Sequence, residues 1–258
     1  MNCLVINIDD YGASIPADKR ILDLLKSGAA SSVSFFATSP HFAQASANLL
    51  ALSQEFDIGV HLDLSFGMGV LHGVQTFGQK GQYPKLLSTL RPGDVKDEFR
   101  AQTEKLLAAG IELTHMDNHR PEIYFMPQLF KTVLELASEF GLYVRTPFTS
   151  SFERRISQYS HHYAISKDEL RHVWKKSYDM QEKIGSLHAD HFELFTGVHH
   201  SVEGMRGLLS NLEEGLTELC SHAGQTRQDF AGEYDVLSEA LSLGLTEGKL
   251  SRRPRRGV

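Results

Sequence analysis

The chain has 258 residues, of which 41% are hydrophobic and 22% charged, so it can bury the core of one large domain and is neither disordered nor fibrous. Its 26 Lys and Arg against 32 Asp and Glu give a formal charge of −6, which excludes an overall basic field for nucleic acid or an anionic membrane. The two cysteines, Cys3 and Cys220, make no disulfide framework, and no apolar run approaches the ~18 residues of a membrane span, so a soluble cytoplasmic protein is predicted.

Short apolar runs alternate with amphipathic stretches through the first part of the chain. The run 3–6 is typical of a strand buried on both faces, and Ile21, Leu24 and Leu25 then form one helical stripe that ends at Gly28. The same alternation predicts strands at 32–36, 57–64, 111–116 and 142–145, and helices at 42–52, 98–109 and from Pro127 to Phe140.

The later part of the chain continues this alternation less clearly. We predict helices at 170–180, 202–214 and 234–241, and strands at 186–193 and 217–221. Six or seven βα units of this kind require a parallel sheet, either open or closed into a barrel. The turn after the first strand has no G-x-G-x-x-G, and no phosphate-binding G-x-x-x-x-G-K-[ST] occurs, so an α/β fold with an irregular (β/α) barrel is favoured over a nucleotide fold. We expect one domain over 1–250 and a solvated basic tail at 251–258.

The longest connection runs from about Ser65 to Pro92 and contains five glycines. It exceeds the ~12–15 residues that are common for structureless loops, so it is either a lid or binding element or a surface insertion. Because it directly follows the strand that carries His61, we predict that it borders a substrate cleft.

The first polar cluster at a strand end is the pair Asp9 and Asp10. Adjacent carboxylates repel each other unless a cation or proton lies between them or they point apart. A helix N-cap explains one Asp but less easily both. In extended backbone successive side chains alternate, so we expect the two carboxylates to point to opposite sides.

Two further clusters combine imidazole with carboxylate. His61 and Asp63 share one face of their strand, and His115, Asp117 and His119 share one face of the next if that strand persists. A lone His is more often a core residue, but two imidazoles and a carboxylate from three strand ends form the composition of a catalytic metal site, in which an Asp orients a ligating His.

A fourth candidate is His222, which closes the apolar stretch before it. The paired histidines at 161–162 and 199–200 have polar surroundings and are predicted to lie on the surface.

Taken together, four ordered segments resemble a known family. The segments N-I-D-D-Y-G at 7–12, G-V-H-L-D-L at 59–64, T-H-M-D-N-H at 114–119 and E-L-C-S-H at 218–222 resemble the signatures of the YdjC-like (ChbG-like) carbohydrate deacetylases, and they span about residues 3 to 224. The resemblance implies a (β/α) barrel related to the NodB-type polysaccharide deacetylases, one divalent metal ion (zinc or magnesium), and removal of an N-acetyl group from an amino sugar or short oligosaccharide. It also implies a small carbohydrate partner, with no nucleic acid or membrane, and suggests a homodimer.

The resemblance also implies roles for six residues. The metal ligands are Asp10, His61 and His119. The catalytic residues are Asp9 as general base, His222 as acid, and Arg145, which corresponds to the arginine after the next strand. With the two aspartates pointing to opposite sides, we expect one of them to face the metal and the other to face the water or Arg145.

Some positions depart from the family pattern and leave alternatives open. Arg120 and Glu122 stand where the family has a His-rich run, and Ala223 stands where proline is common. A non-catalytic sugar-binding relative is therefore one alternative. The other is a non-haem iron oxygenase using His61 and Asp63 with a distal His, although such sites usually occur on β-sandwich folds.

Overall fold

The computed structural model describes residues 2–52, 55–66, 68–71, 90–147, 149, 152–153, 156–157, 160, 165–195, 200–230 and 232–253. The strands are β1 (Asn2–Tyr11), β2 (Ser32–Phe35), β3 (Asp57–Leu62), β4 (His115–Asn118), β5 (Tyr143–Val144), β6 (His191–Leu194) and β7 (Gly215–Ser221). The helices are α1 (Ile15–Ser27), α2 (Phe42–Leu50), α4 (Pro92–Ala108), α5 (Pro127–Phe140), α7 (Lys167–Ile184), α8 (Val202–Ser210) and α9 (Glu233–Ser242), with 3-10 helices η1 (Pro121–Phe125) and η3 (Gln228–Phe230).

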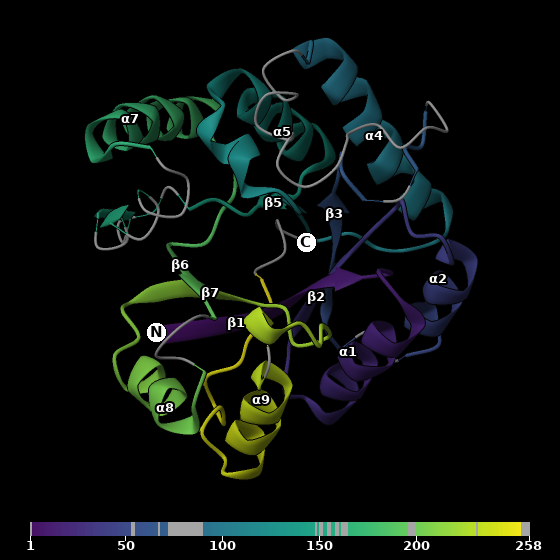
Figure 1. Ribbon diagram of the computed structural model, residues 1–258, viewed down its shortest axis with the longest axis vertical. Coiled ribbons are helices and arrows are strands. Elements are labelled where there is room, and N and C mark those ends of the chain that lie inside the picture. Colours follow the sequence, from purple (N-terminus) through teal and green to yellow (C-terminus); the bar gives the residue numbers. More distant parts are fainter. Residues whose placement is uncertain are drawn as a thin grey trace.

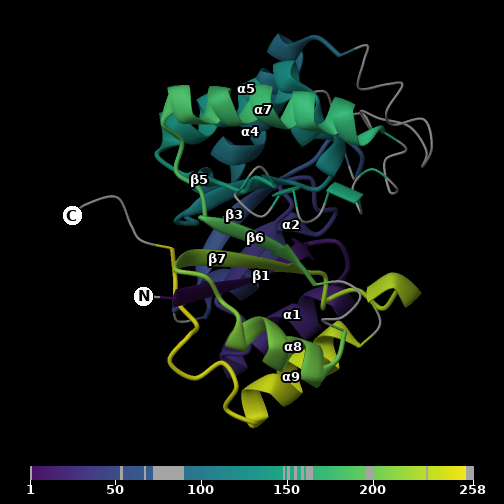
Figure 2. The ribbon, with the colours of Figure 1, turned by 90° about the vertical axis from the view of Figure 1, so that its left-hand side faces the viewer.

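The strands form one parallel sheet in the order β5-β4-β3-β2-β1-β7-β6. The sheet curls, with α4, α5 and α7 on one side of it and α1, α8 and α9 on the other (Figures 1 and 2). The Val144 N–H of β5 donates to the Leu187 carbonyl at 2.7 Å, so the edge at β5 meets the segment that leads into β6 at the other edge. The prediction of an α/β fold with a (β/α) barrel is confirmed.

Most predicted elements are present, with shifted boundaries. Gly28 ends α1 with φ 79, a left-handed conformation that a residue without Cβ adopts readily. α4 begins at Pro92 rather than at 98, because proline suits the first helical turn. β4 occupies 115–118 rather than 111–116. Residues 115–118 pair with 59–62 of β3, whereas 111–114 precede this paired segment.

The interior of the barrel is polar, and this decides where functional side chains can lie. Along β1, Leu4, Ile6 and Ile8 pack into the main apolar core. The alternate residues face inward, where Asn7 donates to Ser34 Oγ at 2.9 Å. Buried polar groups need partners, so these inward polar side chains are committed to hydrogen bonds and ion pairs, whereas Val5 of the same strand packs in a small apolar cluster with Ala189 and Leu216.

The C-terminal segment closes the end of the barrel where the strands begin, away from the arrowheads in Figure 2. Leu250 forms a parallel bridge with Leu4, and Ser251 N–H donates to the Leu4 carbonyl at 2.8 Å. Arg253 is only 3% exposed. The prediction of a solvated tail from 251 is therefore wrong at Arg253, which pairs with the buried carboxylates of Glu218 and Asp57. Residues 254–258 lie outside the described residues, as do 72–89 of the Gly-rich connection.

Candidate metal and catalytic site

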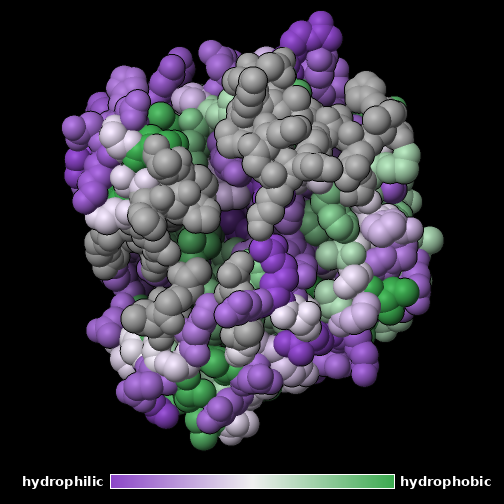
Figure 3. All heavy atoms as spheres, viewed as in Figure 1, coloured by the Kyte–Doolittle hydropathy of each residue, from purple (hydrophilic) through white to green (hydrophobic). Residues whose placement is uncertain are grey.

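Three of the predicted residues converge at the end of the barrel where the strands finish, the end that faces the viewer in Figures 1 and 3. Asp10 Oδ1 lies 3.2 Å from His61 Nε2 and 3.0 Å from His119 Nδ1. Among the described residues, none of these three buried atoms has a hydrogen-bond partner. One carboxylate oxygen and two imidazole nitrogens left unsatisfied at one point are the donor set of a divalent cation, so these residues fit the metal that the resemblance implies.

A β-bulge explains how neighbouring aspartates both reach this site. The β1–β2 register shifts between Ile8 and Tyr11, and Asp10 has φ 68, the left-handed region that residues with a Cβ rarely adopt. Asp9 Oδ2 therefore lies 4.0 Å from His61 Nε2. The expectation that strict alternation separates the two side chains is wrong, although Asp9 does turn toward Arg145 as predicted. The second oxygen of Asp10 accepts from Gln225 Nε2 at 3.1 Å.

The orientation of His61 is set by Asp117, not by a residue of its own strand. His61 Nδ1 lies 2.5 Å from Asp117 Oδ1, which leaves Nε2 directed at Asp10. Burial lowers the pKa of His61, but the carboxylates of Asp117 and Asp9 outweigh burial and raise the pKa to about 10. A cation bound at Nε2 would take the place of that proton.

Aromatic side chains form one wall of the site. The centroid of the Phe36 ring lies 4.8 Å from that of His61, 5.0 Å from that of His119 and 4.8 Å from that of Phe66. This apolar wall limits water around the ligand atoms, which strengthens electrostatic interactions there.

Asp9 is held as a carboxylate by a buried ion pair. Its oxygens accept from Arg145 Nη1 at 2.7 Å and Nη2 at 2.8 Å, and from Asn7 Nδ2 at 2.7 Å. Burial alone raises the pKa of Asp9, but the Arg145 guanidinium, then His61, hold it well below the usual range. Arg145 also pairs with Asp117 at 2.9 Å and Glu218 at 2.6 Å.

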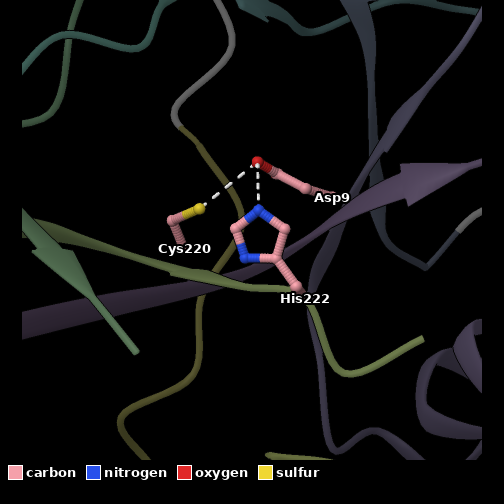
Figure 4. A group of neighbouring side chains, drawn as sticks. All are labelled: Asp9, Cys220 and His222. Atoms are coloured by element: carbon pink, nitrogen blue, oxygen red, sulfur yellow. Dashed lines mark hydrogen bonds and ion pairs between the residues drawn. The ribbon is translucent and has the colours of Figure 1, made fainter. Parts of the chain in front are cut away.

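His222 approaches Asp9 from the end of β7 (Figure 4). Its Nε2 lies 3.9 Å from Asp9 Oδ2, and Cys220 Sγ donates to the same oxygen at 3.3 Å. The three could hold an ion by distance alone, but the guanidinium on both oxygens of Asp9 disfavours a second cation. His222 stacks on Phe230 at 4.3 Å, and its backbone N–H donates to Glu233 Oε2 at 2.6 Å. Burial lowers the pKa of His222 despite the nearby aspartates.

Two other histidine and carboxylate candidates have structural partners instead. Asp63 accepts from the backbone N–H groups of Ser65 at 2.8 Å and Phe66 at 2.5 Å, so it does not join His61 as the oxygenase alternative requires. His115 is fully buried over Gly59, where any Cβ would collide with its ring. It is not among the described groups that could hold a metal.

Several neighbours of the site carry little sequence signal. Gln225 and Glu233 lie in the polar region after the last predicted strand, and Arg253 lies in the basic tail. Glu218 stands within a signature segment, but alternation alone does not say what it pairs with. Arg120 Nε donates to Ser65 Oγ at 2.9 Å, so this departure from the family pattern ties the end of β4 to the loop after β3.

A parallel barrel whose strand ends gather a carboxylate, two imidazoles and a second, arginine-bound carboxylate defines a protein with an enzyme-type site at the barrel mouth. The sequence pattern of the family described as YdjC-like protein matches residues 3–245, and the chain belongs to this family. It is 28% identical over 248 residues to carbohydrate deacetylase 1 of Listeria innocua, covering 90% of this chain and 96% of that protein. A carbohydrate deacetylase of Clostridium beijerinckii is 30% identical over 146 residues, covering 55% and 59% of the two chains.

The fold is also similar to that of solved structures. A proposed cellobiose-phosphate cleavage protein of Enterococcus faecalis aligns with a TM-score of 0.75 and 20% identity over 98% of both chains. At this identity the likeness supports the fold alone. Within the described ranges, no helix combines the length and apolar character needed to cross a bilayer.

Proposed function

We propose that this protein hydrolyses the N-acetyl group of an amino sugar or short oligosaccharide in a metal-dependent reaction that releases acetate. The observation that carries the proposal is the convergence of three unsatisfied ligand atoms beside an ionised carboxylate held by arginine. The names of the similar Listeria and Clostridium proteins support the substrate class.

In this proposal Asp10, His61 and His119 hold one divalent cation. Two imidazoles favour zinc over magnesium, which prefers oxygen ligands. When bound, the cation acts as a Lewis acid on the acetyl carbonyl and lowers the pKa of water. Phe36 restricts bulk water on one side, and Asp117 keeps His61 in the orientation that presents Nε2.

Asp9 and His222 divide the proton transfers between them. Asp9 takes the proton of the attacking water, since Arg145 and Asn7 keep it ionised and oriented. His222 delivers a proton to the leaving amine as the C–N bond breaks, so water and amide become acetate and a free amino sugar. Its half-buried ring, stacked on Phe230, can reach a substrate at the mouth.

The test is acetate release from a panel of N-acetylated sugars, combined with elemental analysis of the purified protein. We expect one divalent ion per chain and activity that a chelator removes and zinc restores. Glu139→Gln, which alters an exposed pair with Arg100, serves as the matched control for every site variant. A protein that binds acetylated sugar but releases no acetate with any divalent metal would instead be a sugar-binding relative, which the altered third signature favours as second candidate.

Two further expectations stay predictions, one suggested by the resemblance and one by the composition of the chain. A homodimer is checked by light scattering of the purified chain. A cytoplasmic location is checked by fractionating cells that express it.

A further inference from the structure

Arg253 reaches the inside of the barrel from the end opposite the candidate site. Its side chain is 1% exposed, its Nη2 lies 2.8 Å from Glu218 Oε2, and its backbone N–H donates to Asp57 at 2.7 Å. Its neighbour Arg252 also pairs with Asp57, at 3.1 Å, but is 33% exposed. A buried arginine costs free energy unless it is fully paired, so its place calls for a physical reason.

One chain of contacts leads from Arg253 to Asp9 through Glu218. Glu218 contacts Arg253 with Oε2 and accepts from Arg145 Nε with Oε1 at 2.6 Å. The guanidinium is planar, so fixing Nε fixes the direction of both Nη groups, which donate to Asp9. Glu218 is therefore clamped between two arginines, and it sets the rotation of the arginine that holds Asp9.

A second chain reaches the same carboxylate through β1 and β2. Arg253 Nη1 donates to Ser32 Oγ at 2.7 Å, and Ser32 Oγ donates to Asn7 Oδ1 at 2.5 Å. Asn7 then donates through Nδ2 to Asp9 Oδ1 at 2.7 Å. The two routes share only Arg253 and Asp9. Arg253 is therefore connected both to Arg145 and to Asn7, the two residues that donate nitrogen-bound hydrogens to Asp9.

The charges inside the barrel explain why a second arginine matters. Asp9, Asp117 and Glu218 all contact Arg145, so a single guanidinium faces three buried carboxylates. Arg253 supplies a second positive charge to Glu218. Without it, Glu218 competes with Asp9 for Arg145, because a buried carboxylate with no other cation draws the guanidinium toward itself.

We propose that Arg253 is a positioning residue for the candidate active site, acting through Glu218–Arg145 and Ser32–Asn7 to hold Asp9 in its orientation. This inference rests on the proposed function for its effect on catalysis, but its structural content is independent of that reaction. Sealing the barrel alone would not require the guanidinium to contact Glu218 and Ser32 at once.

The first measurement follows Arg145 directly in ¹⁵N-labelled protein. The Nε–H resonance of Arg145, assigned with Arg145→Lys, should shift by more than a linewidth in Arg253→Ala. It should stay in place in the matched control Arg252→Ala, which removes an arginine that also pairs with Asp57. If Arg253→Ala does not fold, Arg253→Lys is used instead. Lysine keeps the positive charge but lacks the planar set of guanidinium donors, so a smaller shift of the resonance in the same direction is expected. An unmoved resonance in the folded Arg253 variant, or an equal shift in Arg252→Ala, overturns the proposal.

The second measurement is kinetic. Arg253→Ala should lower kcat for acetate release ~10- to 100-fold with little change in KM, the scale of a small misplacement of a reacting group, and Arg253→Lys should recover part of the loss. A change confined to KM, or an equal loss in Arg252→Ala, contradicts a positioning role. If the unaltered protein releases no acetate, the proposed function fails, while the Arg145 resonance still decides the role of Arg253.

Discussion

Replacing Asp9 by Asn tests the general-base assignment with the least change in shape. The amide keeps the size of the carboxylate, and its oxygen can still accept from one Nη of Arg145. Its NH₂ group, however, must face the donors of the oxygen that it replaces, which are Arg145 and Asn7 at Oδ1 or Arg145 and Cys220 at Oδ2.

The cost to stability follows from what Arg145 retains. Breaking a buried ion pair by removing one partner costs about 3–5 kcal/mol. Arg145 keeps Asp117 at 2.9 Å and Glu218 at 2.6 Å, so we expect about 3 kcal/mol, the lower end of that range. Urea unfolding of Asp9→Asn against the unaltered protein measures this loss.

The cost to catalysis should be larger than the cost to substrate binding. Asn cannot accept the proton of the attacking water, so kcat for acetate release should fall ~10²–10⁴-fold while the metal content stays unchanged. Asp10→Asn should instead lose metal and recover part of its activity at high metal concentration, because Asp10 Oδ1 meets both imidazoles. Full activity in Asp9→Asn would refute the general-base mechanism, and loss of metal in Asp9→Asn but not in Asp10→Asn would reverse the two roles.

The remaining predictions concern the ligands, the long connection and one buried acid. His61→Ala and His119→Ala should each remove the metal, by elemental analysis, with the circular dichroism spectrum largely preserved; full retention of metal in both contradicts the ligand set. Shortening the connection at 65–92, most of which lies outside the described residues, should raise KM or lower kcat without changing metal content, and unchanged kinetics would make it a surface insertion. Burial raises the pKa of Glu233 to about 7, so the folded protein binds a proton that the unfolded chain releases, and this contribution to stability is lost as the pH rises from ~4.3 through 7. Glu233→Gln should therefore raise the Tm relative to the unaltered protein at pH 8 but not at pH 4.5, and equal differences at both pH values would refute this.

The strand ends were predictable because a buried parallel strand leaves a simple trace in the sequence. An apolar run such as that before Asp9 or around His61 must end where the sheet meets solvent, and polar residues at that point gather at one end of the barrel. The same reasoning located His119 and His222 without any knowledge of their partners. Which of these side chains would share a metal was not deducible from spacing, and the proposed ligand assignment depends on the family resemblance.

Contacts across the barrel were not predictable from local patterns. Glu218 on β7 and Arg145 after β5 are 73 positions apart and meet only because the sheet curls. Arg253 lies in a segment whose basic composition is typical of a solvated tail, and its burial depends on the carboxylates of Asp57 on β3 and Glu218 on β7. Net charge and periodicity describe a segment by itself, whereas a buried ion pair is a property of two segments.

The bulge at Asp9 and Asp10 interrupts the alternation of side chains along β1 at the candidate site. Alternation assigns adjacent residues to opposite faces, and a regular β1 would direct one carboxylate away from the site. The left-handed φ of 68 at Asp10 abandons alternation at a cost in backbone energy, so the surrounding structure must hold it there. Gln225 holds one oxygen of Asp10 in this conformation.

As a result, two chemically identical side chains occupy different environments. Asp9 is paired with a guanidinium, whereas Asp10 has an oxygen that is directed at two imidazoles and makes no hydrogen bond among the described residues. The strained backbone thus lets one pair of neighbours serve as both proton acceptor and metal ligand in the proposed reaction.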